Sequence, residues 1–218
     1  MSWEIFDRAA SGYEAWYVTR RGRRADVAER RLLLHLLMPF QDARSAVEIG
    51  CGTGHFDAFL TQQGLLAIGL DRAPAMLNEA RRQFPRLPVV LGDAQQLPFR
   101  DACTDLAVFI TTIEFLEDPV RALDEAARIA RQGIIAIALN RHSIGGLSRR
   151  FGPQSRGALL GQARDHSAAE LRTALERAAL ARLDRTWTAS TLFPDGLSRV
   201  ISHIPFGDVI GSAVRFKH

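Results

Sequence analysis

The stretch that decides the fold is Val47-Glu48-Ile49-Gly50-Cys51-Gly52-Thr53-Gly54. A short apolar run over 46–49 predicts a strand at its start, and helical spacing over 56–63 predicts a helix after it. Glycines allow the chain to turn sharply between the two and let a ligand approach the backbone with no Cβ in the way. The amide groups at the start of the helix would suit a carboxylate or a phosphate.

On both sides of this turn, short apolar runs alternate with amphipathic segments. The runs lack strict polar alternation, which is typical of parallel strands covered on both faces. We therefore predict an α/β fold, Rossmann-like and doubly wound, with a mostly parallel seven-stranded sheet, an antiparallel last strand and helices on both faces. The further strands are predicted at 65–70, 88–91, 106–110, 133–139, 182–191 and 208–216, and the further helices at 25–38, 75–84, 120–130 and 168–181.

The composition fits one globular domain. The chain has 218 residues, 47% of them hydrophobic, and it lacks the apolar run of about 18 residues that a membrane-spanning helix needs. Residues 1–24 lack the apolar stretch of a signal peptide, so we expect a cytoplasmic protein. Cys51 and Cys103 have no metal-ligand spacing, so we expect two free thiols and no metal site. The net charge of +4 is almost all arginine, because Lys217 is the only lysine, and this usage is typical of GC-rich bacterial genomes.

Acidic residues stand at the ends of the first three predicted strands. Glu48 lies two residues before the first glycine, Asp71 closes the second strand and Asp93 follows the third. The Asp71 carboxylate could accept both hydroxyls of a ribose, although it could also cap the following helix. A dinucleotide-binding turn would require glycine or alanine three residues after Gly52, where this chain has His55. This difference disfavours a nicotinamide-dependent oxidoreductase.

The block around the glycines resembles motif I of the class I S-adenosylmethionine-dependent methyltransferases, in which an acid precedes a G-x-G-x-G turn. The stretch 92–99 is similar to the segment of that family in which an aspartate and the next amide contact adenine. The stretch 105–119 resembles the small ubiquinone-biosynthesis-like members, although Arg131-Gln132-Gly133 departs from their usual proline-glycine-glycine turn. The resemblance covers about residues 45–140 and implies S-adenosyl-L-methionine as the cofactor.

The resemblance also implies which residues would bind that cofactor. Asp93 would accept from the adenine amino group and the Ala94 amide would bond a ring nitrogen, whereas Met76 would either pack on the adenine or fill the core. Glu114 and His142 follow strands at the same rim and are the candidate catalytic bases. The full cofactor set is Glu48, Gly50, Cys51, Gly52, Gly54, Asp71, Arg72, Met76, Asp93, Ala94, Thr111 and Tyr17.

Segments outside this core are expected to complete the site. We divide the single methyltransferase domain of 1–218 into an N-terminal helical cap over 1–40, the cofactor-binding core over 45–140, a substrate or lid insertion over 141–166 and a C-terminal helix and strand pair over 167–218. Tyr13, Trp16 and Tyr17 would either cover the cofactor or pack on the core. The glycines of the insertion would let it close over the site and exclude water.

Methyl transfer to a small-molecule acceptor is the function we expect. Two alternatives stay open: an RNA or protein methyltransferase, which the arginine excess would favour, and a methyltransferase fold that acts as a non-catalytic interaction module. The stretch Thr111-Thr112-Ile113-Glu114 stands where amino-methylating enzymes have an N-P-P-Y-type motif, which argues against an adenine or glutamine nitrogen as acceptor. No nucleic-acid-binding module is recognisable, and the sequence leaves the acceptor and the oligomeric state open.

Overall fold

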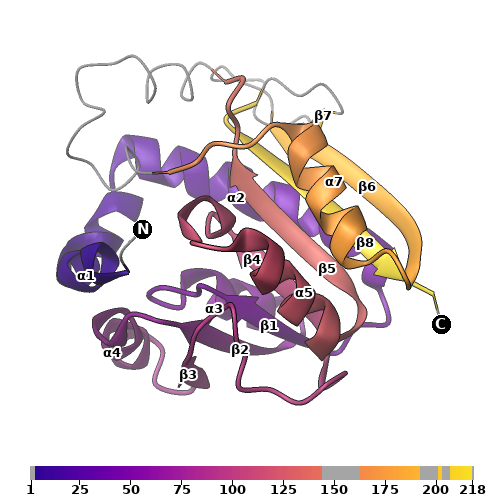
Figure 1. Cartoon of the computed structure of the whole chain (residues 1–218). Coiled ribbons are helices and arrows are strands. Elements are labelled where there is room, and N and C mark those ends of the chain that lie inside the picture. The colour runs from indigo at the N-terminus through magenta and orange to yellow at the C-terminus, as the bar shows by residue number, and fades with distance from the viewer. Residues whose placement is uncertain (1–2, 144–162, 192–200, 203–206, 218) are drawn as a thin grey trace.

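The computed structural model describes residues 3–143, 163–191, 201–202 and 207–217. Within these residues the strands form one sheet in the order β3-β2-β1-β4-β5-β8-β6-β7 (Figure 1). All the predicted strands are present, and a two-residue strand, β7, extends the edge beside β6. The strands are β1 (Ser45–Ile49), β2 (Leu66–Asp71), β3 (Val89–Leu91), β4 (Thr104–Ile110), β5 (Ala130–Leu139), β6 (Leu183–Thr191), β7 (Ile201–Ser202) and β8 (Val209–Phe216).

The direction of the strands places the site. Strands β1 to β5 run parallel to one another, and β8 runs antiparallel between β5 and β6. The strand order reverses at β1, because β2 and β3 lie on one side of it and β4 and β5 on the other. Such a reversal opens a crevice at the carboxyl ends of the strands, where sheets of this kind bind ligands. The predicted Rossmann-like fold with an antiparallel last strand is confirmed.

Helices cover both faces of the sheet. Helices α5 (Pro119–Ile129) and α7 (Ala168–Ala178) pack on one face, and α2 (Arg20–Leu37) and α3 (His55–Gln62) pack on the other (Figure 1). Helix α4 (Pro74–Gln83) packs beside β2 and β3. Successive side chains of β4 and β5 alternate between these layers, with Phe109 and Ala136 in the first and Val108 and Ile135 in the second. Strand β4 is buried throughout, so hydrophobic packing on both faces fixes the centre of the sheet.

The N-terminal region differs from the prediction in its helices. Apolar spacing predicted one helix over 25–38, whereas the structure has α1 (Glu4–Tyr17) and the longer α2, followed by the short helix η1 (Met38–Phe40). Thr19 begins α2 ahead of its apolar stripe, because the Thr19 hydroxyl accepts a hydrogen bond from the Gly22 amide at 2.9 Å. Helix α1 lies beside α4, at the carboxyl ends of the parallel strands (Figure 1).

The segment 141–166 is described only at its two ends. Asn140 pairs with His166 in a β-bridge, in which the His166 amide donates to the Leu139 carbonyl at 3.0 Å. The lid expected here falls mostly on 144–162, outside the described residues. Among the helices that the structure describes, none has the length and apolar composition needed to cross a membrane. Among all the residues that the structure describes, the His, Cys, Asp and Glu side chains form no group that could hold a metal ion.

Candidate active site

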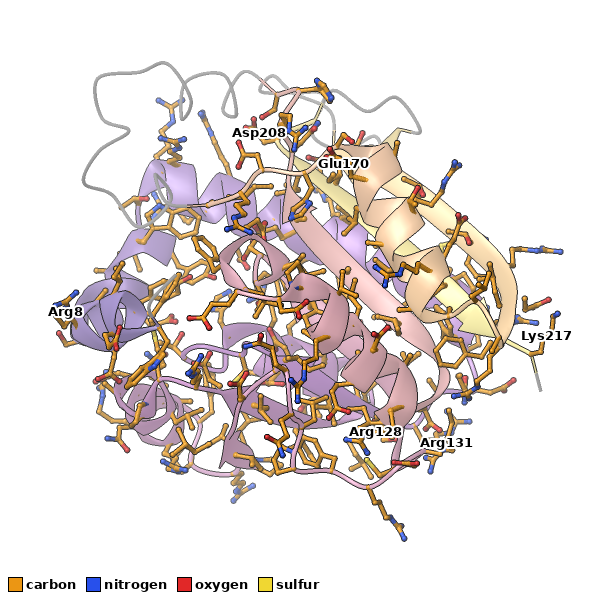
Figure 2. The ribbon with its side chains drawn as sticks, in the orientation of Figure 1. Arg8, Arg128, Arg131, Glu170, Asp208 and Lys217 are labelled. Carbon is orange, nitrogen blue, oxygen red and sulfur yellow. The ribbon has the colours of Figure 1, made fainter. Side chains whose placement is uncertain are left out.

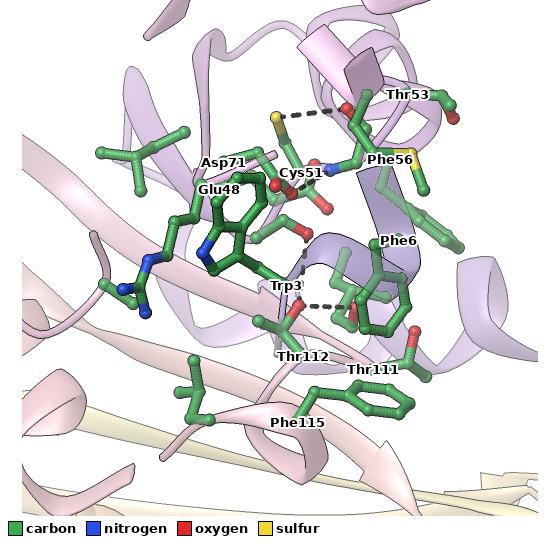
Figure 3. A pocket seen from close by; sticks show the side chains of 18 of the residues that line it. Trp3, Phe6, Glu48, Cys51, Thr53, Phe56, Asp71, Thr111, Thr112 and Phe115 are labelled. Carbon is green, nitrogen blue, oxygen red and sulfur yellow. Dashed lines mark hydrogen bonds between the residues drawn. The ribbon is translucent and has the colours of Figure 1, made fainter. Parts of the chain in front are cut away.

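A pocket opens at the carboxyl ends of β1, β2, β3 and β4, next to helix α1 (Figure 3). Figure 3 shows Glu48 and Asp71 gathered beside Cys51 on its polar side. Its apolar side includes Phe6 of α1 and Phe115 of the short helix η2 (Ile113–Phe115), whose rings meet edge-on with 4.8 Å between centroids. Of the residues predicted to bind the cofactor, the lining contains Glu48, Gly50, Cys51, Gly52, Asp71, Arg72, Met76, Asp93, Ala94, Thr111 and Tyr17.

The glycine turn has a left-handed backbone at each of its glycines. Gly50, Gly52 and Gly54 have φ angles of +79°, +54° and +78°. A Cβ on Gly50 would lie 2.2 Å from the methyl group of Thr112, and a Cβ on Gly54 would lie 2.8 Å from Leu87. A Cβ on Gly52 would meet no described protein atom within 4 Å, so this part of the backbone opens into the pocket. Gly54 faces the core instead and is not part of the lining.

Asp71 joins the glycine turn to the start of α4. Its Oδ2 accepts a hydrogen bond from the Gly52 amide at 2.8 Å, and its Oδ1 accepts one from the Ala73 amide at 2.8 Å. Each oxygen keeps further acceptor capacity, because a carboxylate offers about four acceptor sites. Burial raises the pKa of Asp71, and the two amide hydrogen bonds act against this shift. The carboxylate is therefore fixed in place and can accept two more hydroxyl donors.

Residues that follow β2 and β3 close another part of the pocket. Asp93 Oδ1 accepts a hydrogen bond from the Gln95 amide at 2.9 Å, and Asp93 Oδ2 lies 3.6 Å from Arg72 Nη1. The same Arg72 nitrogen lies 3.9 Å from Glu117 Oε2, so the guanidinium bridges two acids at the rim. Met76 lines the pocket and is also buried in a small apolar cluster with residues of α1. Met76 is therefore a core residue that also faces the pocket, and its contact with adenine stays a prediction.

Glu48 lies next to a second carboxylate that the sequence analysis did not single out. Glu48 is 2% exposed, and Asp57 of α3 is fully buried. Burial raises the pKa of Glu48 well above its usual range, and the neighbouring Asp57 raises it further. Gly69 leaves space for this pair, since a Cβ there would lie 2.3 Å from Asp57 Oδ2. Two neighbouring buried carboxyl groups favour a state with a single negative charge between them.

The aromatic residues of α1 cover the pocket and also pack against its wall. Tyr13 and Tyr17 line the pocket, whereas Trp16 touches Tyr17 from outside the lining, with 5.0 Å between ring centroids. Burial raises the pKa of both tyrosines well above the usual range. Tyr17 stacks on His55, with 3.9 Å between centroids and 8° between the ring planes. Packing of these aromatics against the neighbouring side chains is thus observed, and covering of the cofactor stays a prediction.

His55 fastens both N-terminal helices to the glycine turn. Its Nε2 lies 2.8 Å from Asp26 Oδ1 on α2, and its Nδ1 lies 3.7 Å from Glu14 Oε2 on α1. Glu14 also accepts a hydrogen bond from the hydroxyl of Thr53. Arg30 joins the group, with its Nη2 2.8 Å from His55 Nε2 and its Nε 2.6 Å from Asp26 Oδ1. His55, which stands where a dinucleotide-binding turn would have glycine or alanine, therefore holds helices α1 and α2 against the pocket.

The two candidate bases lie away from the pocket. Glu114 of η2 is fully buried, and its Oε1 accepts a hydrogen bond from the Leu139 amide at 2.5 Å, at the end of β5. His142 is exposed beyond β5, and neither residue belongs to the lining. Thr111, with φ of +48°, turns the chain after β4 so that Thr111 and Thr112 line the pocket while Glu114 contacts the end of β5. The described structure does not bring Glu114 and His142 together with the predicted cofactor residues.

Several residues of the site had only a weak signal in the sequence. Phe6, Tyr13 and Tyr17 recur at helical spacing, which would have predicted that one face of α1 is apolar. Trp3, which also lines the pocket, has no such pattern. Asp57 interrupts an otherwise apolar face of α3, and an acid in that position is a sign of a buried polar group.

Comparison with known sequences agrees with this geometry. Residues 47–138 match the family model described as a methyltransferase domain. A malonyl-[acyl-carrier protein] O-methyltransferase of Pectobacterium atrosepticum is 34% identical over 136 residues, which make up 62% of this chain and 51% of that protein. The chain spans about half the length, or less, of the curated relatives it matches.

Solved structures are similar over nearly the whole chain. A SAM-dependent methyltransferase of Thermotoga maritima, described as a possible histamine N-methyltransferase, is 29% identical with a TM-score of 0.83 and covers 99% of this chain and 100% of its own. A magnesium protoporphyrin IX methyltransferase of Synechocystis PCC 6803 with bound SAH is 18% identical with a TM-score of 0.67. The match covers 97% of this chain and 98% of that one, and at this identity it shows a shared fold only. Residues 47–138 match the methyltransferase domain family, and together the relatives and solved structures support a class I S-adenosylmethionine-dependent methyltransferase with S-adenosylmethionine as its cofactor.

Proposed function

We propose that the protein transfers a methyl group from S-adenosylmethionine to a small-molecule acceptor in the pocket next to α1. One observation carries this proposal: the backbone of Gly52 is open to the pocket, and its amide donates to Asp71 in the same wall. A ligand that bears both a polar chain and a ribose can lie close to such a backbone and donate its hydroxyls to the carboxylate beside it. The residues present therefore fit the cofactor.

Each part of the cofactor has matching groups in the lining. The turn from Gly50 to Gly52 would hold the methionine part, with Glu48 beside it, and Gly54 would act only through the conformation of the turn. Asp71 would accept the ribose hydroxyls. Asp93 and Ala94 would bind the edge of the adenine ring. The contacts would be completed by Cys51, Arg72, Met76, Thr111 and Tyr17.

The chain itself has to position the acceptor and exclude water. When bound, S-adenosylmethionine supplies an activated methyl group on a sulfonium, so no protein nucleophile is needed. The rings of Trp3, Phe6 and Phe115 give the pocket an apolar wall that keeps water out. Burial raises the pKa of the Cys51 thiol well above its usual range, so this cysteine is a poor nucleophile and contributes packing.

The arginines on the side of the molecule away from the pocket do not form a free basic surface. Arg128 lies 2.7 Å from Asp101, and Arg131 lies 2.9 Å from Asp105, so these guanidinium groups are already paired with acids. Figure 2 shows Arg128 and Arg131 at the opposite side of the molecule from Arg8 on α1. A nucleic-acid surface would need arginines near the pocket, and the described group that could form one is the exposed set at the start of α2, Arg20, Arg21, Arg23 and Arg24. The relatives are named after different acceptors, so the acceptor does not follow from similarity alone.

Calorimetric titration with S-adenosylhomocysteine and with NAD tests the cofactor half of this proposal. We expect binding of the first and none of the second, and the reverse result would contradict the assignment. Incubation with labelled S-adenosylmethionine and a small-molecule extract, an RNA extract or a protein extract tests the acceptor class. Label in the small-molecule fraction supports the proposal. Label only in RNA or protein, or binding of cofactor without transfer to any fraction, would favour one of the two alternatives.

A further inference from the structure

Two carboxyl groups, Glu48 of β1 and Asp57 of α3, meet beside the glycine turn. Glu48 lines the pocket and is 2% exposed, whereas Asp57 is fully buried. Glu48 pairs in register with Gly69 of the parallel strand β2, so its side chain leaves the sheet on the face where a Cβ of Gly69 would lie. That Cβ would be 2.3 Å from Asp57 Oδ2. The register and the missing side chain of Gly69 therefore place the Asp57 carboxyl beside Glu48.

Three of the four oxygens in this pair lack a hydrogen-bond donor. Among the residues that the structure describes, Glu48 Oε2 and both carboxyl oxygens of Asp57 are buried and have no hydrogen-bond partner. Two ionised carboxylates cannot hydrogen-bond to each other, and a buried acceptor without a donor is costly. A single proton on one of the acids reduces this cost, because the protonated carboxyl donates to the other.

The titratable groups that act on the pair are acidic. They are Asp71 at the end of β2, the Cys51 thiol in the turn and the Tyr17 phenol of α1. Burial raises the pKa of Asp57 to about 7, and burial together with Asp57 raises the pKa of Glu48 well above its usual range. The pair therefore favours a state with one proton and one negative charge.

We propose that Asp57 is a positioning residue for the cofactor. It holds the proton of the pair in the occupied pocket and donates it to Glu48, so that the ionised Glu48 carboxylate accepts the ammonium group of the methionine part. The charge settles on Glu48 because this acid lines the pocket, and an ammonium favours the ionised form of the nearer carboxyl. This inference rests on the proposed methyl transfer in the same pocket.

Packing alone does not explain an acid at position 57. Its neighbours on the buried face of α3 are Phe56, Phe59 and Leu60, and an apolar side chain would be buried there at lower cost. A hydrogen-bond donor to Glu48 is what an apolar side chain could not supply. Gly69 fits the same purpose, because any larger residue there would push the Asp57 carboxyl away from Glu48.

Two ligands that differ only in the ammonium group test the inference. They are S-adenosylhomocysteine and its deaminated analogue, in which hydrogen replaces the amino group. In calorimetric titrations the wild type should bind S-adenosylhomocysteine at least about tenfold more tightly than the analogue. Asp57→Leu removes the donor at similar volume and should reduce this preference to about threefold or less. Asp57→Asn keeps a donor in its amide group and should retain the preference.

The matched control is Asp93→Asn, which alters an acid elsewhere in the lining and should weaken both ligands alike. Equal binding of the two ligands by the wild type overturns the inference, and this comparison stands even if a variant does not fold. A full preference in folded Asp57→Leu, or its loss in folded Asp57→Asn, also overturns it. Failure of the wild type to bind S-adenosylhomocysteine would instead reject the proposed function itself.

Discussion

Replacing Asp71 with alanine isolates the proposed ribose contact. In the structure each carboxylate oxygen already accepts one backbone amide, from Gly52 and from Ala73, both at 2.8 Å. The remaining acceptor sites would take one ribose hydroxyl per oxygen. Two charge-assisted hydrogen bonds are worth roughly 1.5 to 3 kcal/mol each, but water solvates the same carboxylate in the free protein, so we expect a net loss of about 2 to 4 kcal/mol. This loss corresponds to binding that is weaker by about 30-fold to 900-fold.

The assay is calorimetric titration of S-adenosylhomocysteine into the wild type, Asp71→Ala and Asp71→Asn. Asparagine keeps one acceptor oxygen, so it should lose less affinity than alanine. Alanine also leaves the Gly52 and Ala73 amides without their acceptor, at a cost of about 1 to 3 kcal/mol each where they stay buried, so the free energy of unfolding is measured in parallel. Asp101→Ala, which removes an exposed acid far from the pocket, is the control. A folded Asp71→Ala protein with affinity within about threefold of the wild type would refute the ribose assignment.

Three further predictions follow from single side chains. Gly52→Ala should weaken S-adenosylhomocysteine binding by at least about tenfold, because its methyl group enters the pocket. Gly50→Ala should mainly lower the melting temperature, because its methyl group meets Thr112. Equal melting temperatures for the two variants would contradict this difference. His55→Ala should raise hydrogen exchange in α1, and unchanged protection would show that the cap is held by other contacts. The pKa of Glu29 rises from 4.5 to about 8 on folding, so the folded state keeps a proton that the unfolded state has lost in between. The free energy of unfolding of the wild type should therefore fall as pH rises through this window, with up to ~5 kcal/mol of the fall due to Glu29. The pKa values of Glu48, Asp57 and Asp71 are also raised, so Glu29→Gln should still lose stability over this window, but by less than the wild type. Parallel curves for the two proteins would reject the raised pKa of Glu29.

The sheet could be predicted from the sequence because its signals are local. The buried strands are short apolar runs, and the turn after β1 needs glycines for its left-handed backbone, so both leave a mark within a few residues. The helix α1 was missed because its inward face mixes aromatic and small residues, and because Gly12 stands in its middle. The start of α2 was misplaced because Thr19 caps a first turn that is almost entirely arginine.

The two ends of the pocket differ in how far the sequence reveals them. The cofactor end is built by residues at the ends of successive parallel strands, so each acid or glycine stands directly after an apolar run. The opposite end brings Phe6 and Tyr13 of α1 together with Phe115 of η2, and nothing in the spacing of these residues predicts that they meet. Glu114 illustrates the difference, since its position after β4 pointed to the rim, whereas the turn of η2 directs it to the end of β5.

Packing alone gives no reason for an acid at position 29. The stripe that it shares with Leu32, Leu33 and Leu36 is apolar, and a leucine or methionine there would extend the stripe against the same core without the penalty of burying a charge. The acids around it add to that penalty, because each raises the free energy of the ionised form. An ionised carboxylate in this position therefore destabilises the protein, which agrees with the raised pKa of Glu29. Glu29→Met should therefore be at least as stable as the wild type, most clearly near pH 8 and above, and a lower free energy of unfolding of this variant in denaturant would contradict the reasoning.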